Sequence, residues 1–459
     1  MAVRRMDGRP RGARRWRDVE TGGPAGRPQG VCMDQALVDR IKQDMAWEFT
    51  RAAPPDGFPA FPDIPTGRYT DDRFWELERR HLWPRVWVMA GRAEEIPGAG
   101  DYFTFDDLGV PILIVRGGDG DVRAYYNTCK HRGAPVVRDP RGSARNLRCQ
   151  YHGWTYDIDG GQLVRVPDER DFVGLCKEDR GLTAISCEVW ENWIFVNQDP
   201  DAASLREWFG VALDQMEELA GSTLRAISLQ SQTIACNWKV TAEAFLEVYH
   251  FRHIHARGPA GGDTLLDSRG AAMGLLPNGC SRMITPFSKR AAEAVGMSDW
   301  SDWKHIVAPG FTDIPTVNDM FRCTSSAFSL FPNLISPVGA EGFPFLMFWP
   351  LDQRTTRLDW IYYAPKDWEG DRLPDHWQKK LDNFEIIMEE DRRNMAPMQH
   401  SLESPALRGV PINYQERRIW HFHEQIDRTI GVDNIPEELR VAQLLAPYVE
   451  GARATTGVR

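Results

Sequence analysis

The sequence predicts an α+β protein in which a small antiparallel β domain precedes a larger domain whose antiparallel sheet is covered by helices. Three observations support this prediction. The chain of 459 residues is long enough for two or three domains. Residues 83–198 show short apolar runs separated by turns, and from residue 199 onward helical patterns alternate with longer apolar runs.

The start of the chain differs from the rest. Its first thirty residues contain eight arginines, six glycines and almost no large apolar side chains. Such a segment buries too little surface to offset the entropy of ordering. We therefore expect residues 1–32 to be a disordered extension, with a transit peptide or an anion-binding arm as alternatives. Residues 33–82 are expected to form a helical segment that packs on the larger domain, which spans residues 199–459.

Bulk composition narrows the functional classes. The net charge is −10, and a phosphate-binding protein usually has a basic face, so nucleic acid is not the expected partner. The most apolar run, residues 343–350, is too short to span a membrane and is interpreted as a buried strand. The eight cysteines are scattered and do not resemble a disulfide framework, which favours a cytoplasmic protein.

The smaller β domain is predicted over residues 83–198. Asp-Gly pairs at 119–120 and 159–160 each separate two alternating apolar runs, a pattern typical of hairpins. Two loops of this domain contain pairs of metal-ligand residues, and each pair combines one cysteine with one histidine. The pairs are Cys129-x-His131 and Cys149-x2-His152.

Three interpretations of these four residues compete: unrelated surface residues, one structural zinc site, or a two-iron, two-sulfide cluster. A single zinc ion accepts any arrangement of its ligands, so it does not require mixed loops. In the cluster, two thiolates hold one iron and two imidazoles hold the other. Two loops that approach from opposite sides then each supply one ligand to each iron. The mixed loops therefore favour the cluster.

A second group of candidate ligands lies in residues 237–256. On a helix Glu243, Glu247 and His250 fall on one face, which suggests either a metal site or a solvated polar face. His253 and His255 compete as partners of His250. His253 stays near that face if the helix continues, and His255 joins it only if the helix breaks after about residue 251.

A third piece is the predicted long helix over residues 374–396. Its apolar stripe, continued by one turn, reaches Asp391, whereas Glu389 and Glu390 point elsewhere. A carboxylate on a buried face is costly unless it is paired or bound to metal. Asp391 therefore either pairs with a neighbouring arginine or completes a two-histidine, one-carboxylate site for non-haem Fe(II).

The lining of a substrate pocket is less well determined. Residues 257–318 have no clear period and are interpreted as loop-rich cover over a pocket. The large apolar side chains of the later strands are either pocket lining, which would favour an apolar substrate, or ordinary core. These side chains are Phe328, Leu330, Phe345, Met347 and Trp349.

Taken together, these motifs resemble those of the α subunits of Rieske non-haem iron oxygenases, over roughly residues 66–430. The spacing of the two loops, with Gly133 and Gly153 beside them and a following tryptophan to shield a cluster, is similar to that of Rieske domains. The stretch NWKVTAEAFLEVYHFRHIH is similar to the family's catalytic segment. The resemblance implies that Cys129, His131, Cys149 and His152 hold a [2Fe-2S] cluster, and that the mononuclear iron ligands are His250, His255 and Asp391.

The resemblance also implies a fold and an assembly. The fold would combine a Rieske domain with a helix-grip-like catalytic domain, and the assembly would be a homotrimer. Glu247 lies where the family places the carboxylate that links the cluster of one subunit to the iron of the next. Ala244 departs from the family pattern, in which many members have asparagine, so the role of that side chain is in doubt here.

The activity implied by the resemblance is that of a terminal oxygenase. Such an enzyme takes electrons from a separate NAD(P)H reductase, sometimes through a ferredoxin, and uses O2 to hydroxylate a small aromatic or alicyclic substrate. Oxidative demethylation, including that of a quaternary ammonium compound, is one alternative. An electron-transfer Rieske protein without oxygenase activity is the alternative from another class. No membrane or nucleic-acid partner is expected.

Overall fold

The computed structural model describes residues 33–255, 265–365, 367–370 and 372–450. The predicted disordered extension, residues 1–32, lies outside the described residues. Contacts divide the described chain into two compact units. One contains residues 89–200, and the other combines residues 33–88 with residues 201–450. Among the described residues, no helix is long and apolar enough to cross a membrane.

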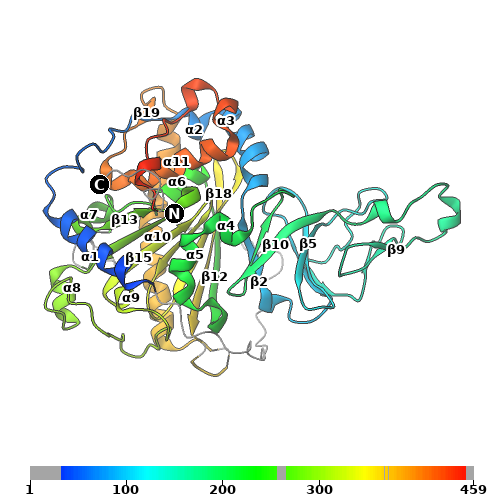
Figure 1. Cartoon of the computed structure of the whole chain (residues 1–459), viewed down its shortest axis with the longest axis horizontal. Helices are drawn as coiled ribbons and strands as arrows, with labels where there is room; N and C mark the ends of the chain where they lie inside the picture. Colours follow the sequence, from blue (N-terminus) through cyan, green and yellow to red (C-terminus); the bar gives the residue numbers. More distant parts are fainter. Residues whose placement is uncertain (1–32, 256–264, 366, 371, 451–459) are drawn as a thin grey trace, which may run out of the picture. The chain divides into compact units, whose positions relative to one another are not determined.

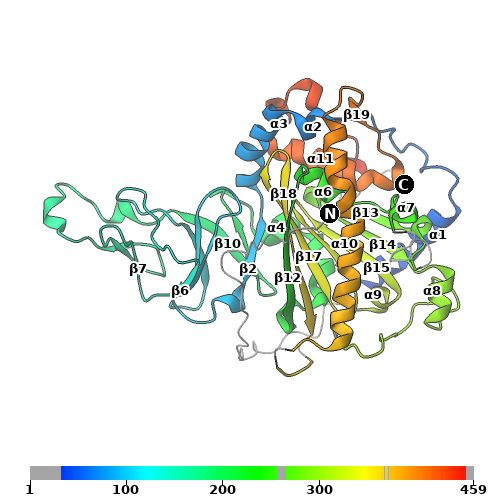
Figure 2. The ribbon, with the colours of Figure 1, turned by 180° about the vertical axis from the view of Figure 1, so that it is seen from behind.

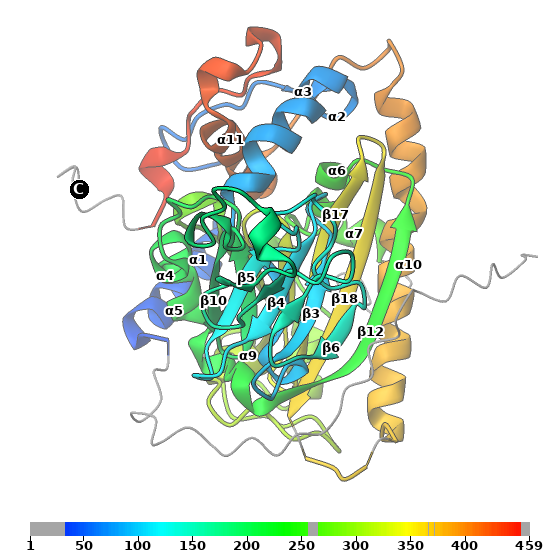
Figure 3. The same cartoon turned by 90° about the vertical axis from the view of Figure 1, so that its right-hand side faces the viewer.

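The smaller unit is built from antiparallel β-structure, as the sequence predicted. Figure 3 shows β10, β5, β4, β3 and β6 side by side, and β11 and β2 continue the same sheet. A second sheet contains three strands in the order β7-β8-β9. The strands are β2 (Val88–Arg92), β3 (Asp101–Phe105), β4 (Ile112–Arg116), β5 (Val122–Tyr126), β6 (Arg141–Ser143), β7 (Leu147–Arg148), β8 (Thr155–Tyr156), β9 (Leu163–Arg165), β10 (Ala184–Trp190) and β11 (Trp193–Asn197).

Both predicted hairpins of this unit are confirmed. Strands β4 and β5 pair antiparallel with Ile112 opposite Tyr126, and the turn between them contains Gly120 at φ 93°. Strands β8 and β9 pair antiparallel around the second Asp-Gly pair, with Gly161 at φ 66°. Glycine adopts such positive φ values without steric cost, which explains its place in both turns.

The larger unit is centred on one seven-stranded antiparallel sheet. The strand order is β12-β18-β17-β16-β15-β14-β13, visible in green and yellow in Figure 1. The strands are β12 (Leu224–Ile234), β13 (Ala272–Leu275), β14 (Ser281–Pro286), β15 (Thr324–Leu330), β16 (Leu334–Val338), β17 (Phe343–Asp352) and β18 (Thr355–Pro365); the short β1 (Ile64–Pro65) pairs with β19 (Gly409–Val410).

Two sequence predictions for this sheet need correction. The largely apolar run of residues 327–336 predicts one strand, but a turn at residues 331–333 divides it between β15 and β16. The interpretation of residues 257–318 as loop-rich cover is wrong for residues 272–294, which contribute β13 and β14 to the sheet and contain α8 (Lys289–Ala294), whereas residues 295–318 contain no helix or strand. A strand as short as β13 carries too few alternating residues to show a period in the sequence.

Helices pack around this sheet, and α10 runs along it (Figure 2). The aromatic side chains Trp377 and Phe384 of α10 contact Tyr362 of β18, which fixes the helix on one face. The helix extends six residues beyond its predicted end. The helices are α1 (Gln35–Thr50), α2 (Gly67–Thr70), α3 (Asp72–Leu77), α4 (Leu205–Phe209), α5 (Val211–Met216), α6 (Trp238–Glu243), α7 (Phe251–Ile254), α8 (Lys289–Ala294), α9 (Asp319–Cys323), α10 (Asp375–Leu402) and α11 (Arg417–Ile430).

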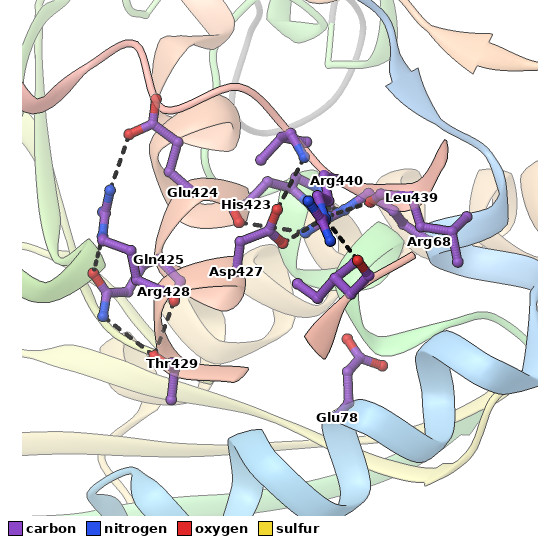
Figure 4. Close-up of polar contacts among 12 residues, drawn as sticks. Arg68, Glu78, His423, Glu424, Gln425, Asp427, Arg428, Thr429, Leu439 and Arg440 are labelled. Carbon is purple, nitrogen blue, oxygen red and sulfur yellow. Dashed lines mark hydrogen bonds and ion pairs between the residues drawn. The ribbon is translucent and has the colours of Figure 1, made fainter. Parts of the chain in front are cut away.

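Two buried ion pairs link α2 to α11 and α6 to the helical turn that follows α3. The Arg68 guanidinium of α2 reaches the Asp427 carboxylate of α11 at 2.7 Å, with both side chains fully buried (Figure 4). Lys239 of α6 forms an equally buried pair with Glu78 at 2.7 Å. A buried charge is tolerated only when it is paired, so each contact holds its two elements next to each other. They thereby position α6, which leads directly into the segment with the candidate metal ligands.

Candidate functional site

The two cysteine-histidine loops have the same backbone closure. In each loop a glycine N–H donates to the carbonyl of the cysteine four positions earlier. The distance is 3.0 Å from Gly133 to Cys129 and 2.9 Å from Gly153 to Cys149. Both glycines have a positive φ, 75° and 73° respectively, a conformation that other residues adopt only with strain. The two loops therefore have near-equivalent backbone geometry.

The loops sort their ligand atoms by type. Cys129 and Cys149 are buried, and neither forms a disulfide. His131 is half-buried and His152 is exposed, and their Nδ1 atoms approach each other to 3.0 Å. Thiols inside and imidazoles outside match a two-iron cluster with a different ligand type on each iron. The donor set therefore fits a [2Fe-2S] cluster, and the assignment of the four residues to it remains a prediction.

Tyr156 lies beside these four residues, although no pattern in the sequence indicated it. The hydroxyl of Tyr156 accepts a hydrogen bond from the Lys130 N–H at 2.9 Å and lies 3.2 Å from the Cys129 sulfur. The hydroxyl acts as an acceptor toward the Lys130 N–H, so its own proton can still be donated to the sulfur. Trp154 behaves as predicted: it is buried and stacks on the His131 ring at 4.9 Å.

Residues 237–250 do not form one continuous helix, which Glu243, Glu247 and His250 would need in order to share a helical face. Helix α6 ends at Glu243, and residues 244–250 are irregular. Glu243 turns away and accepts hydrogen bonds from His423 at 2.8 Å and from Tyr69 at 3.1 Å. Further along, the Leu246 carbonyl accepts a hydrogen bond from Arg418 at 3.2 Å. The prediction that Glu243 shares a face with His250 is therefore wrong, because tertiary hydrogen bonds replace the helical ones here.

The irregular segment brings three candidate ligands together. The Nε2 atoms of His250 and His255 lie 3.2 Å apart. The Oδ1 atom of Asp391 lies 3.6 Å from the first and 3.3 Å from the second. The helix break that His255 needs is present, but it lies before residue 251 rather than after it. His253 is exposed and takes no part in the group.

Each histidine is oriented by a glutamate on its other ring nitrogen. Glu247 contacts Nδ1 of His250, and its second carboxylate oxygen accepts from the His250 backbone N–H at 3.1 Å. Glu390 lies 2.8 Å from Nδ1 of His255. A carboxylate at Nδ1 places the proton there and leaves Nε2 free to bind a metal. The prediction that Glu390 points elsewhere is thus wrong, because its flexible side chain bends back toward His255.

The surroundings of His255 favour a positive charge at this site. Burial alone would lower the pKa of His255, but Asp391 and Glu390 outweigh it and raise that pKa. The structure shows no Asp391–arginine pair among the residues it describes, and Arg392 instead contacts Glu385 and Glu389, each at 2.7 Å. Two imidazoles and one carboxylate converging with oriented tautomers fit the facial arrangement of non-haem Fe(II). Their assignment as iron ligands remains a prediction.

A cavity of about 530 Å³ adjoins the three ligands and lies between α10 and one face of the large sheet. The sheet contributes small or medium side chains such as Ser325, Ala327 and Ile335, together with Tyr362. Side chains alternate across a sheet, so the neighbouring positions of these strands face away. The large apolar residues considered as pocket lining are therefore core, and none of them lines the cavity: Phe328, Leu330, Phe345, Met347 and Trp349.

Comparisons with known proteins agree with this arrangement. A Rieske [2Fe-2S] domain model matches residues 86–182, and a model of the ring hydroxylating alpha subunit (catalytic domain) matches residues 205–431. The alpha subunit of biphenyl 2,3-dioxygenase from Rhodococcus jostii (strain RHA1) is 39% identical over 199 residues, which cover 41% of this chain and 43% of that protein. The alpha subunit of 2-aminobenzenesulfonate 2,3-dioxygenase from Alcaligenes sp is 33% identical over 46% of this chain and 54% of that protein. The chain thus spans about half the length of the curated relatives it matches.

Solved structures share the fold across most of the chain. The quaternary ammonium Rieske monooxygenase CntA in complex with L-carnitine has a TM-score of 0.64 and 20% identity, covering 83% of this chain and 99% of that chain. Naphthalene 1,2-dioxygenase from Rhodococcus sp. bound to indole has a TM-score of 0.62 and 19% identity, covering 86% and 98%. At this identity the similarity establishes the fold alone.

Proposed function

Because this chain belongs to the family of ring hydroxylating alpha subunits, with a Rieske [2Fe-2S] domain ahead of the catalytic domain, we propose that it is a terminal oxygenase. It would use O2 and electrons from an external NAD(P)H reductase to hydroxylate an apolar aromatic or alicyclic substrate. The observation that supports this most strongly is the convergence of His250, His255 and Asp391 at the wall of the cavity. A protein that only transferred electrons would have no need of a metal triad beside a substrate-sized cavity.

The chain's own residues would hold two metal groups. Cys129, Cys149, His131 and His152 would bind the cluster, and the three converging residues would bind the iron. When bound, the cluster supplies single electrons and the mononuclear iron activates O2 for insertion into the substrate. Around them, the protein excludes water from the cysteine side and keeps both iron-binding imidazoles in the Nδ1–H tautomer.

Glu247 is proposed as the link between the two kinds of metal site. It is 8% exposed, and one of its oxygens holds the His250 ring while the other is fixed by backbone N–H groups. A carboxylate fixed on an iron-binding imidazole can also accept a hydrogen bond from a cluster histidine of a neighbouring subunit. This role requires an oligomer, and a homotrimer is the proposed state.

The cavity walls support an apolar substrate. Phe245, Phe251, Ile387 and Met388 line the part of the cavity nearest the triad, together with Ala244. These side chains bind by excluding water and offer no hydrogen bonds, so they favour a ring or alicyclic carbon skeleton beside the iron. A small side chain at residue 244 leaves space where many relatives in this family have a polar amide.

Metal analysis of the purified chain tests the proposal. We expect about three irons and two acid-labile sulfides per chain, whereas two irons would indicate an electron carrier and zinc without sulfide would contradict both interpretations. The Asp391→Ala variant should keep the visible absorption of the cluster and lose product formation with a surrogate reductase. Loss of the cluster spectrum in that variant would contradict the division of roles between the two sites.

A further inference from the structure

The cavity is elongated along α10. Eight of its lining residues come from this helix, and they recur every three or four positions, so they form one continuous face. At a rise of 1.5 Å per residue this face extends over about 22 Å. Its first member is His376 and its last is Asp391, so the metal triad lies at one end of the cavity.

The two ends of the cavity differ in charge. The carboxylates that line it, Glu247 and Asp391, both belong to the metal end. The opposite end is lined by Lys379 and Lys380. Lys380 forms an ion pair with Glu341, and its ammonium group lies 5.3 Å from the centre of the Phe311 ring. The end remote from the metal is therefore cationic.

At this end of the cavity, Lys379 is a residue whose charge has no partner among the described residues. It is exposed at the mouth of the cavity, and no hydrogen bond or ion pair to it is found among the described residues. Asn383 lies one helical turn further and His376 one turn earlier, so all three project from the same face of α10. The Nε2 atom of His376 is buried and has no hydrogen-bond partner within the described chain.

The start of α10 adds to the positive potential. The helix begins at Asp375 after Pro374, which provides no side-chain cap, so the first backbone N–H groups lack a side-chain acceptor. The partial positive charge of a helix N-terminus favours an anion within its first turns. Asp375 does not cancel this effect inside the cavity, because its side chain is 94% exposed and pairs with Arg372 at 3.4 Å.

We propose that the substrate is an elongated apolar molecule that carries an anionic group, a carboxylate or sulfonate, at the end remote from the oxidised carbon, and that Lys379 binds this group. The inference rests on the proposed oxygenase function. Twelve residues of helix separate Lys379 from Asp391 by about 18 Å, so a substrate that reaches both ends must be elongated. Two linked or fused rings that carry the anionic group at one end have such a shape.

The same features disfavour a cationic substrate. A quaternary ammonium group needs aromatic faces or carboxylates that are free of competing cations. Here Phe311 already lies beneath the ammonium group of Lys380, and Glu341 is already paired with it. Lys379, which has no ion pair among the described residues, would repel a further positive charge at this end of the cavity.

Binding of three matched probes tests the inference without turnover. Biphenyl-4-carboxylate, biphenyl and a biphenyl-4-trimethylammonium salt would be titrated against the holoenzyme in the absence of reductase, by calorimetry or equilibrium dialysis. We expect the carboxylate to bind about twofold to fivefold more tightly than biphenyl, since an ion pair with a solvent-exposed lysine contributes about that much. The preference should be lost in Lys379→Gln and reversed in Lys379→Glu. Tighter binding of the ammonium probe to the unmodified protein would overturn the inference.

A matched lysine outside the cavity provides the control. Lys289 on α8 has an 85% exposed side chain and does not line the cavity. The Lys289→Gln variant should keep the preference for the carboxylate, because it removes one charge from the surface without touching the site. If Lys289→Gln and Lys379→Gln lower the preference equally, only overall charge matters and the inference fails.

Turnover measurements separate this inference from the proposed function. With a surrogate reductase, oxygen uptake and product formation would be followed for the carboxylate and for biphenyl. A carboxylate preference in binding without any turnover would refute the oxygenase but leave the anion site intact. If biphenyl is turned over and the binding preference for the carboxylate does not depend on residue 379, the anion site is refuted but the oxygenase function is not.

Discussion

Removal of Glu390 should weaken iron binding without disturbing the cluster. This carboxylate lies 2.8 Å from Nδ1 of His255, and the two side chains are 14% and 3% exposed. The contact is thus largely shielded from water and holds the imidazole with Nε2 toward the other ligands. In Glu390→Ala the His255 ring is no longer held in its orientation, and it loses the neighbouring negative charge that makes Nε2 a stronger ligand for the metal.

The expected size of the effect follows from this geometry. A hydrogen bond to a charged group contributes about 1.5–3 kcal/mol, which corresponds to about 10–100-fold in Fe(II) affinity. Glu390→Gln keeps an oxygen that can accept the Nδ1 proton but loses the charge, so its affinity should lie between those of the alanine variant and the unmodified chain. The neighbouring Glu389→Ala provides a matched control, because Glu389 is 60% exposed and contacts Arg392 instead.

The assay is a competition between the protein and an Fe(II) chelator of known affinity. The visible absorption of the cluster serves as an internal measure of folded protein, since the cluster ligands belong to the other compact unit. Unchanged Fe(II) affinity in Glu390→Ala would refute the reasoning. Equal losses in the variants at 389 and 390 would refute it too, because they would point to a general effect of charge on α10.

Two further predictions concern contacts with no sequence signal. Tyr156→Phe removes a hydroxyl 3.2 Å from the Cys129 sulfur; since such donors stabilise the reduced cluster, its potential should fall by about 40 mV in a spectroelectrochemical titration. Tyr125→Phe, whose hydroxyl donates to the Asp159 carbonyl, should leave the potential unchanged, and an equal fall in both would contradict the assignment. Lys239→Met leaves the buried Glu78 carboxylate unpaired and should lower the free energy of unfolding in urea by about 3–5 kcal/mol. The double variant with Glu78→Leu should recover most of this loss, and a double variant as unstable as the single one would show that the pair is not the cause.

Much of the fold followed from local chemistry in the sequence. Both predicted hairpins formed, and each turn contains a glycine at positive φ: Gly120 within the first Asp-Gly pair and Gly161 directly after the second. The long apolar stripe of α10 indicated a helix and placed Asp391 on its buried face, where the structure has it. The departures arose where tertiary contacts override local preference, as at Glu243, whose hydrogen bonds to His423 and Tyr69 end α6.

The sequence by itself determined which residue types could bind metal and in what spacing, because metal binding depends on a few side chains, most of which lie close together in the chain. Only the tertiary structure decided what lies beside them. Glu390 is 135 residues from His255, and no periodicity connects the two. The cavity likewise depends on which face of each strand meets α10. The alternation along a strand shows which side chains share a face. Only the packing of the sheet against α10 decides which of the two faces borders the cavity.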